Sequence, residues 1–302
     1  MNRTSRLFAL GALAISFVYL SGNGWAQSPQ RSPTIAVGPQ YDSIHVYVSP
    51  SDVDSFVASF LGTFGGRTTK QVTVTVTPTP SSTTSQILQT PVGTVSLFGF
   101  KTPIPAPFGT ERTGYLVTNM DAAIQQARAS GAEVVVTPFP DLIGMDAILR
   151  FPGGVMTQIY WHTTAPSYAP LARVPENRVY VSQDAADAFL RSFLAFSGGN
   201  VVSDQPAAAG EEIGKPGSTF RRVQVMSTFG KLLVFVTDGQ LPYPYGRETT
   251  GYEVDDLAAT LQKATPLGVK ILVPPITAQG RSSAIVQFPG GYVAEIHSSV
   301  HR

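Results

Sequence analysis

The sequence predicts an α+β fold of tandem paired modules, in which a β-α-β-β-β unit occurs four times and forms two similar domains. The chain repeats two motifs: Pro107–Tyr115 returns as Pro244–Tyr252, and Phe151–Gly154 returns as Phe288–Gly291. Both shifts, from 107 to 244 and from 151 to 288, equal 137 positions, so the segments between the motifs have equal length. Such a long period marks a duplicated domain, because solenoid repeats have periods of about 20–50 residues. The 28 glycines and 24 prolines suit many short strands joined by tight turns.

The first unit is predicted to span residues 43–100. Ser43–Val48 is a β-branched, alternating run that is typical of a strand. A helix follows it, because Ser51 or Asp52 can act as its cap and apolar residues recur at helical spacing until Gly65 and Gly66. The remaining expected elements are a strand at 72–77, a polar loop at 78–85, and a hairpin of strands at 86–89 and 94–100.

The second unit begins with a predicted strand at Thr113–Val117. Asn119 or Asp121 opens its helix, Gly131 ends it, and three strands are expected at 133–136, 147–151 and 155–161. The second half of the chain repeats both units in the same order. We therefore expect one domain at residues 40–162 and another at 177–300, joined by a Pro- and Ala-rich linker at 163–176.

The N-terminus has the pattern of a secretory signal peptide, which we predict at residues 1–26. Arg3 and Arg6 precede the apolar run Leu7–Leu20, and small residues surround Trp25 at the expected cleavage site. The run is shorter than the roughly 20 apolar residues of a spanning helix, although an uncleaved anchor stays an alternative. We expect a bacterial periplasmic or secreted protein that starts near Gln27, with no other membrane contact.

Composition excludes several functional classes. The chain has no cysteine, so disulfides, zinc–thiolate sites and cysteine nucleophiles are absent. Its 21 basic and 20 acidic residues form no basic cluster, so we expect no nucleic-acid partner. The sequence contains no phosphate-binding loop, nucleophile elbow or His-Glu-x-x-His motif. The oligomeric state is not indicated.

The repeated motifs resemble those of a known family. In both halves a Gly-Tyr strand, at Gly114 and at Gly251, leads into a helix that ends at glycine, and a Phe-Pro-Gly-Gly turn is followed by Gln or Glu. This combination is similar to the vicinal oxygen chelate superfamily, which includes glyoxalase I, extradiol dioxygenases and bleomycin-resistance proteins. The resemblance covers nearly the whole chain after the signal peptide and implies a tandem, two-domain, glyoxalase-like fold. It implies that each pair of modules curls into a cup, and that His, Glu or Gln side chains of first and last strands hold a divalent metal.

In the first half, the resemblance places His45 at the first-strand ligand position. Arg112 stands where the second module usually has His, and Gln158 stands at the final-strand position, where Glu is usual. His45 could instead be an ordinary hydrogen-bonded histidine of the core or rim. Arg112 could hold an anionic ligand or pair with Glu111.

In the second half, Arg178 replaces the first His, Thr249 replaces the second, and Glu295 is retained. His297 follows Glu295 by two residues, so both side chains face the same side of a strand. They form either a carboxylate–imidazole pair inside a cup or a solvated polar face. Glu111 and Glu248 occupy equivalent positions in the two halves. These two acids serve either a ligand or the fold, in the latter case by accepting backbone N–H bonds from the preceding turn.

Two functions follow from this incomplete ligand set. The first is an exported glyoxalase-like protein with a degenerate metal site that binds a small aromatic or anionic molecule in its cups, through the candidate residues named above. The second is a lyase, isomerase or dioxygenase that uses Fe, Mn, Ni or Zn, with His45 and Glu295 in a site shared between the halves. Catalytic residues are not assigned, enzymatic activity is left open, and no other cofactor is implied. A purely structural role is a further alternative.

Overall fold

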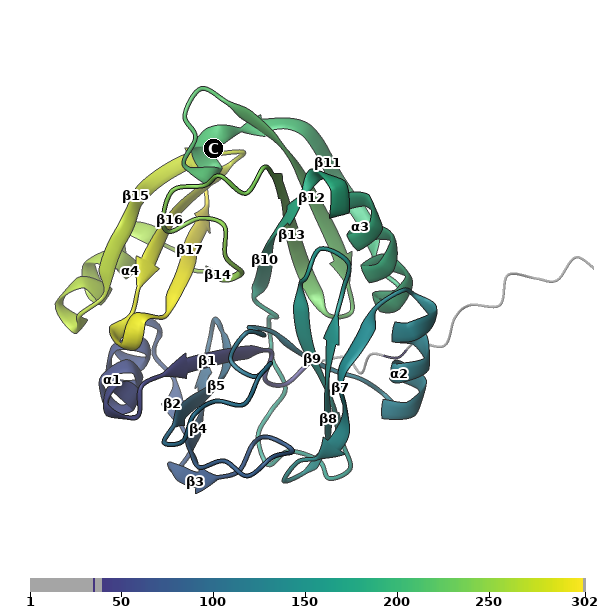
Figure 1. Cartoon of the computed structure of the whole chain (residues 1–302). Helices are drawn as coiled ribbons and strands as arrows, with labels where there is room; N and C mark the ends of the chain where they lie inside the picture. The colour runs from purple at the N-terminus through teal and green to yellow at the C-terminus, as the bar shows by residue number, and fades with distance from the viewer. Residues whose placement is uncertain (1–34, 36–39, 301–302) are drawn as a thin grey trace, which may run out of the picture. The chain divides into compact units, whose positions relative to one another are not determined.

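The four predicted units each fold as a strand, a helix and an antiparallel run of strands. The computed structural model describes residue 35 and residues 40–300, so the predicted signal peptide lies outside the described residues. The first half contains β1 (Ile44–Val48), α1 (Val53–Phe64), β2 (Arg67–Thr68), β3 (Val72–Val74), β4 (Thr83–Thr90) and β5 (Gly93–Phe100), then β6 (Gly114–Leu116), α2 (Met120–Ala129), β7 (Glu133–Pro140), β8 (Gly144–Arg150) and β9 (Met156–His162) (Figure 1).

The second half repeats this order of elements. It contains β10 (Glu176–Ser182), α3 (Gln183–Ser197), β11 (Asn200–Ala209), β12 (Thr219–Ser227) and β13 (Gly230–Thr237), then β14 (Thr249–Glu253), α4 (Leu257–Ala264), β15 (Lys270–Ala278), β16 (Arg281–Gln287) and β17 (Val293–Ser299). The predicted linker lies between β9 and β10 and overlaps the first residue of β10.

Side-chain caps begin two of the helices. The Asn119 carboxamide oxygen accepts a hydrogen bond from the Ala122 N–H and begins α2, as predicted. Asp256 begins α4 in the same way. Asp52 stands at the cap position of α1, but its side chain makes no capping hydrogen bond. Gly65 ends α1 with a φ of 77°.

Several predicted strand bounds differ from the structure: β7 extends to Pro140, beyond the expected residue 136, and β8 begins at Gly144, before the expected residue 147. The strand expected at 72–77 is limited to Val72–Val74, and the loop expected at 78–85 is shorter because β4 already begins at Thr83. Thr83 and Thr84 pair with Phe100 and Gly99 of β5. Their polar side chains concealed this part of the strand from a reading based on hydrophobic alternation.

The same strand pairings recur in every unit. The first strand runs parallel to the last one: β1 to β5, β6 to β9, β10 to β13 and β14 to β17. In the second half, antiparallel pairing of β10 with β14 joins two units into one eight-stranded sheet. In the first half, a single bridge between Ile44 and Thr113 stands at this junction. Gly114 pairs with Gln158 as Gly251 pairs with Glu295, so the register follows the 137-residue repeat.

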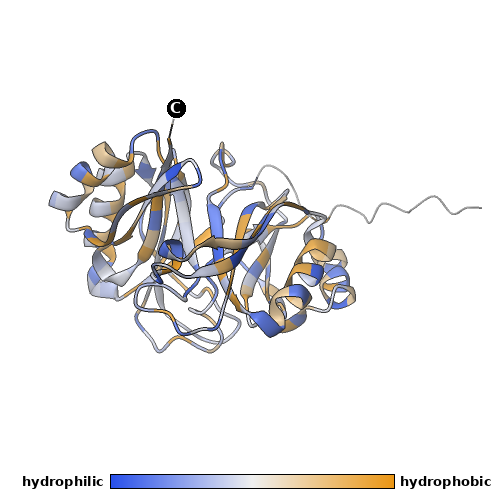
Figure 2. Cartoon of the chain, turned by 90° about the horizontal axis from the view of Figure 1, so that it is seen from above, coloured by the Kyte–Doolittle hydropathy of each residue, from blue (hydrophilic) through white to orange (hydrophobic). Residues whose placement is uncertain are grey.

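The two halves share their hydrophobic cores. One cluster joins α2 and its strands with α3 and β10, β12 and β13. A second joins α1, β1 and β5 with α4, β14, β16 and β17. Figure 2 shows hydrophobic and hydrophilic residues mixed along the helices, as expected for helices with one buried face. None of the described helices is long and apolar enough to cross a membrane.

Candidate functional site

The face of the eight-stranded sheet that carries Arg178 and Glu295 is here called the second cup. Arg178 pairs with Thr249, and Gly251 pairs with both Glu176 and Glu295. Because side chains alternate along strands, this register directs the polar groups of three strands to one face. A Cβ on Gly251 would lie 3.0 Å from Glu295 Oε2 and 3.2 Å from Glu176 Oε1, so glycine leaves the room that the two acids use.

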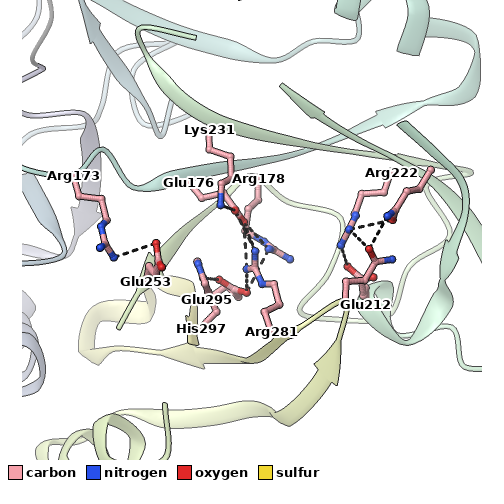
Figure 3. A network of polar contacts seen from close by, with 12 residues as sticks. Arg173, Glu176, Arg178, Glu212, Arg222, Lys231, Glu253, Arg281, Glu295 and His297 are labelled. Carbon is pink, nitrogen blue, oxygen red and sulfur yellow. Dashed lines mark hydrogen bonds and ion pairs between the residues drawn. The ribbon is translucent and has the colours of Figure 1, made fainter. Parts of the chain in front are cut away.

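Two arginines and two glutamates form a buried ion network in this cup (Figure 3). Arg178 Nη1 lies 3.0 Å from Glu176 Oε1 and 3.4 Å from Glu295 Oε1. Arg281 of β16 donates to Glu176 at 3.2 Å and also to Glu295. Burial by itself would raise the pKa of Glu295, but Arg178 and Arg281 hold that pKa well below its usual range. Glu295 is therefore an anion whose charge is already neutralised.

His297 pairs with the same carboxylate. Its Nδ1 lies 2.7 Å from Glu295 Oε2, and both side chains are buried. This geometry is the carboxylate–imidazole pair that the sequence left as one of two alternatives. An ionised carboxylate can only accept, so Nδ1 carries the proton. When the imidazole is neutral, Nε2 is then a hydrogen-bond acceptor.

Two spaces of very different size border this network. An inner cavity lined by Arg178, Arg281, Glu295 and Tyr245 has a volume of only about 20 Å³, enough for about one water molecule. On the other side, an opening of about 370 Å³ is lined by polar and apolar residues. The polar and charged lining side chains include Glu176, Lys231, His297, Arg173 and Glu253. We call this space the opening of the second cup.

Further contacts join β12 to the turn before it and to the two edges of the sheet. Arg222 Nη1 lies 2.6 Å from Glu212 Oε2, and Arg222 also donates to Gln279 at 2.7 Å. Gln205 of β11 bonds Gln279, the residue after β15, at 2.6 Å, which links the two edges of the sheet. These side chains therefore tie the edges of the sheet together at the second cup.

The corresponding face of the first half, here called the first cup, has the same framework with different chemistry. His45 packs edge-on against Phe98 at 5.6 Å, as Arg178 lies over Phe235 at 4.8 Å. The buried His45 Nδ1 is 3.8 Å from Glu111 Oε1 and has no hydrogen-bond partner. Glu111 instead accepts a hydrogen bond from the Tyr47 hydroxyl.

The remaining first-cup candidates lie around this group. The Arg112 guanidinium lies 5.5 Å from the centre of the Tyr47 ring, and the contacts of the described residues include no ion pair between Arg112 and Glu111. Gln158 is half-buried on β9, at the position that Glu295 takes on β17. A Cβ on Gly114 would lie 2.9 Å from His45 Nε2, so the glycine of the repeat again makes room for a polar side chain.

The equivalent acids Glu111 and Glu248 have different partners. Glu248 accepts a hydrogen bond from Thr113 Oγ1 at 2.9 Å and so links the second half to the first. Burial raises the pKa of Glu248 to about 7, against hydrogen bonds from Thr113 and Asn177 that lower it. One alternative from the sequence was that these acids accept hydrogen bonds from backbone N–H groups of the preceding turn. The donors found in the structure are instead the hydroxyls of Tyr47, for Glu111, and Thr113, for Glu248.

The donor sets of the two cups do not fit a catalytic divalent metal. In the second cup, Arg178 and Arg281 surround Glu295, and their fixed positive charges would repel a cation. In the first cup, His45 and Glu111 are two possible ligands, and the final-strand position holds the neutral amide Gln158 in place of a carboxylate, whereas a catalytic site normally needs about three strong ligands. Within residue 35 and residues 40–300, no group of three or more His, Asp or Glu side chains could hold a metal ion. His45 and Glu295 have separate partners in different cups.

Sequence reasoning missed three members of the second-cup network: Glu176, Lys231 and Arg281. A signal existed for Glu176, which precedes Arg178 by two residues on a strand and so shares its face. Arg281 and Lys231 belong to β16 and β13, whose registers against β17 and β10 bring them close. Nothing in a single sequence reveals those registers.

Comparisons with known proteins establish the fold. The sequence matches no protein-family model and no curated protein. A triple mutant of 4-hydroxymandelate synthase from Streptomyces coelicolor superposes with a TM-score of 0.58 at 12% identity, covering 86% of this chain and 93% of that one. The Mn(II)-bound glyoxalase from Novosphingobium aromaticivorans gives 0.53 at 14% identity, with 87% and 82% covered.

A fusion of a xylose isomerase-like TIM barrel with 4-hydroxyphenylpyruvate dioxygenase also gives a TM-score of 0.53, at 14% identity. The match covers 89% of this chain and 50% of the fusion, so this chain spans half its length. All three structures support the resemblance seen in the motifs. The chain has the glyoxalase-like, α+β fold of the vicinal oxygen chelate superfamily, in tandem form.

Proposed function

We propose that this protein is an exported, metal-independent small-molecule-binding protein whose ligand occupies the opening of the second cup. The observation that carries the proposal is the His297–Glu295 pair. Two arginines hold Glu295 ionised, Glu295 orients the imidazole, and His297 lines the opening. The residues that would otherwise hold a metal thus present a fixed hydrogen-bonding group to a ligand.

The opening has the properties of a binding site. Its volume of about 370 Å³ lies within the range of small-molecule pockets. Its lining combines polar and charged side chains with the apolar residues Val92, Val174, Pro175 and Met226. The sequence predicts a ligand inside the cups, but the cavity beside Arg178 is too small for one. The ligand is therefore expected at the mouth of the second cup.

A metal-dependent lyase, isomerase or dioxygenase is the alternative, favoured by the first cup. The buried His45 Nδ1 and Glu111 Oε2 have no hydrogen-bond partner there, and two of the similar structures are named as a Mn(II)-bound glyoxalase and a dioxygenase fusion. The neutral amide of Gln158 at the final-strand position, where a carboxylate is usual, weighs against this alternative.

A ligand screen by thermal shift and NMR tests the binding proposal. We expect compounds that bind the wild type to lose affinity by about tenfold or more in His297→Gln. His162→Gln, a histidine change in the first half, is the matched control and should keep them. Compounds that bind His297→Gln with unchanged affinity, or that shift only the NMR signals of the loop at residues 75–82, would contradict the proposed site.

Export is tested separately on protein from the native envelope fraction. Its N-terminal sequence should begin near Gln27. A full-length cytosolic chain would refute this part of the proposal.

A further inference from the structure

We propose that the ligand of this opening is a small monoanion, such as a carboxylate, with a hydroxyl or amide N–H donor beside its charged group. This inference rests on the proposed function and specifies its ligand class. The anion lies beside Lys231, the donor faces His297, and an apolar body contacts the wall formed by Val92, Val174 and Met226.

The count of charges in the ion network beside the opening favours an anion. Three cations, Arg178, Arg281 and Lys231, stand against two carboxylates, Glu176 and Glu295, which leaves one positive charge. At the rim, Arg173 pairs with Glu253 at 3.1 Å, so this pair adds no net charge. A cationic ligand would be repelled by this excess positive charge, and a neutral ligand would not neutralise it.

The excess charge is available at Lys231. The side chain of Arg178 is 7% exposed, whereas that of Lys231 is 33% exposed. Within the part of the chain that the structure describes, the Lys231 ammonium pairs with Glu176 Oε2 at 3.4 Å, and Glu176 already accepts hydrogen bonds from both arginines. An ammonium has three donors, so Lys231 retains hydrogen-bonding capacity toward the opening.

His297 determines the second group of the ligand. Because its Nδ1 donates to Glu295, the neutral imidazole offers only an acceptor at Nε2. The ligand group opposite must then be a donor, such as a hydroxyl or an amide N–H. A monoanion that lacks this donor would leave the imidazole nitrogen without a partner and bind more weakly.

Three matched compounds test the inference by NMR titration of the purified protein at constant ionic strength. They are 2-hydroxy-3-methylbutanoate, its neutral amide, and 3-methylbutanoate, which lacks the hydroxyl. We expect the hydroxy acid to shift the His297 ring signals and to bind about tenfold more tightly than either of the others. Lys231→Met should remove this preference for the anion. Lys215→Met, which removes a lysine from an ion pair with Asp238 elsewhere, should keep it.

Each other outcome overturns a defined part of the account. Equal binding of the acid and its amide at His297, or unchanged selectivity in Lys231→Met, would refute the anion inference and leave the binding site intact. Signal changes confined to residues outside the opening, for all three compounds, would refute the site itself.

Discussion

The two cups of this protein share a framework and differ in how they treat the same positions. An aromatic residue on the last strand of the unit, Phe98 or Phe235, supports the first-strand side chain in each cup. The first cup places His45 there, and the buried Nδ1 of this side chain has no hydrogen-bond partner. The second cup places Arg178 there, with Nη1 in contact with two carboxylates. The two halves therefore share a scaffold, and the second cup holds the cation Arg178 at the position where the first cup holds His45.

The largest expected difference between the cups comes from removing their first-strand residues. Arg178→Met leaves two buried glutamates with one arginine fewer, and we expect a loss of about 3–5 kcal/mol in the free energy of unfolding. His45→Leu removes a buried polar atom that has no partner, and we expect a change of about 1 kcal/mol or less. Urea denaturation of both variants measures the difference. Equal losses would show that the Arg178 network does not distinguish the cups.

The loops before β6 and β14 allow a second comparison. Phe108 is buried against Phe139 and Ile148, whereas its repeat equivalent Tyr245 is half-buried beside the small inner cavity. We expect Phe108→Ala to lower the free energy of unfolding by about 2–4 kcal/mol and Tyr245→Ala to lower it by about half of that. A larger cost for Tyr245→Ala, measured by the same denaturation, would mean that the second cup depends on its loop more than the contacts indicate.

The paired glycines give a smaller contrast. An alanine Cβ at residue 251 would crowd Glu295 and Glu176, which are fixed by arginines, and we expect a loss of about 1–3 kcal/mol for Gly251→Ala. At Gly114 the neighbour is the single ring of His45, so Gly114→Ala should cost about 1 kcal/mol. Thermal unfolding of both variants tests this order, and a reversed order would contradict the tighter packing assigned to the second cup.

The positions in these comparisons were predictable from the sequence to different degrees. The 137-residue repeat located both sets of equivalent residues, since ungapped segments keep their register, and the glycine and Phe-Pro-Gly-Gly motifs indicated the fold. The identity of the partners was not predictable. Glu111 and Glu248 are equivalent in sequence, yet one bonds Tyr47 of its own half and the other bonds Thr113 of the opposite half. Contacts between halves depend on packing that no local pattern encodes.

The smallest expected effect is a pH dependence of the protein's stability that comes from Glu248. Its pKa rises from 4.5 to about 7 on folding, so its contribution is fully present below about pH 4.5 and is lost as the pH rises through 7. We expect the wild type to lose about 1–2 kcal/mol between pH 5 and pH 8 relative to Glu248→Gln. Denaturation at several pH values, with Glu253→Gln as an acid-removal control, measures this. Parallel curves for the wild type and Glu248→Gln would refute it.

Elemental analysis tests the central claim, that arginine and not a metal neutralises the second cup, most directly. The protein is purified from its native cells and, separately, after supplementation with iron, manganese, nickel or zinc, together with His45→Ala and Glu295→Ala. We predict far less than one metal ion per chain in every sample, with no dependence on either variant. A near-stoichiometric metal that disappears in His45→Ala or Glu295→Ala would contradict the account and favour the metal-dependent enzyme.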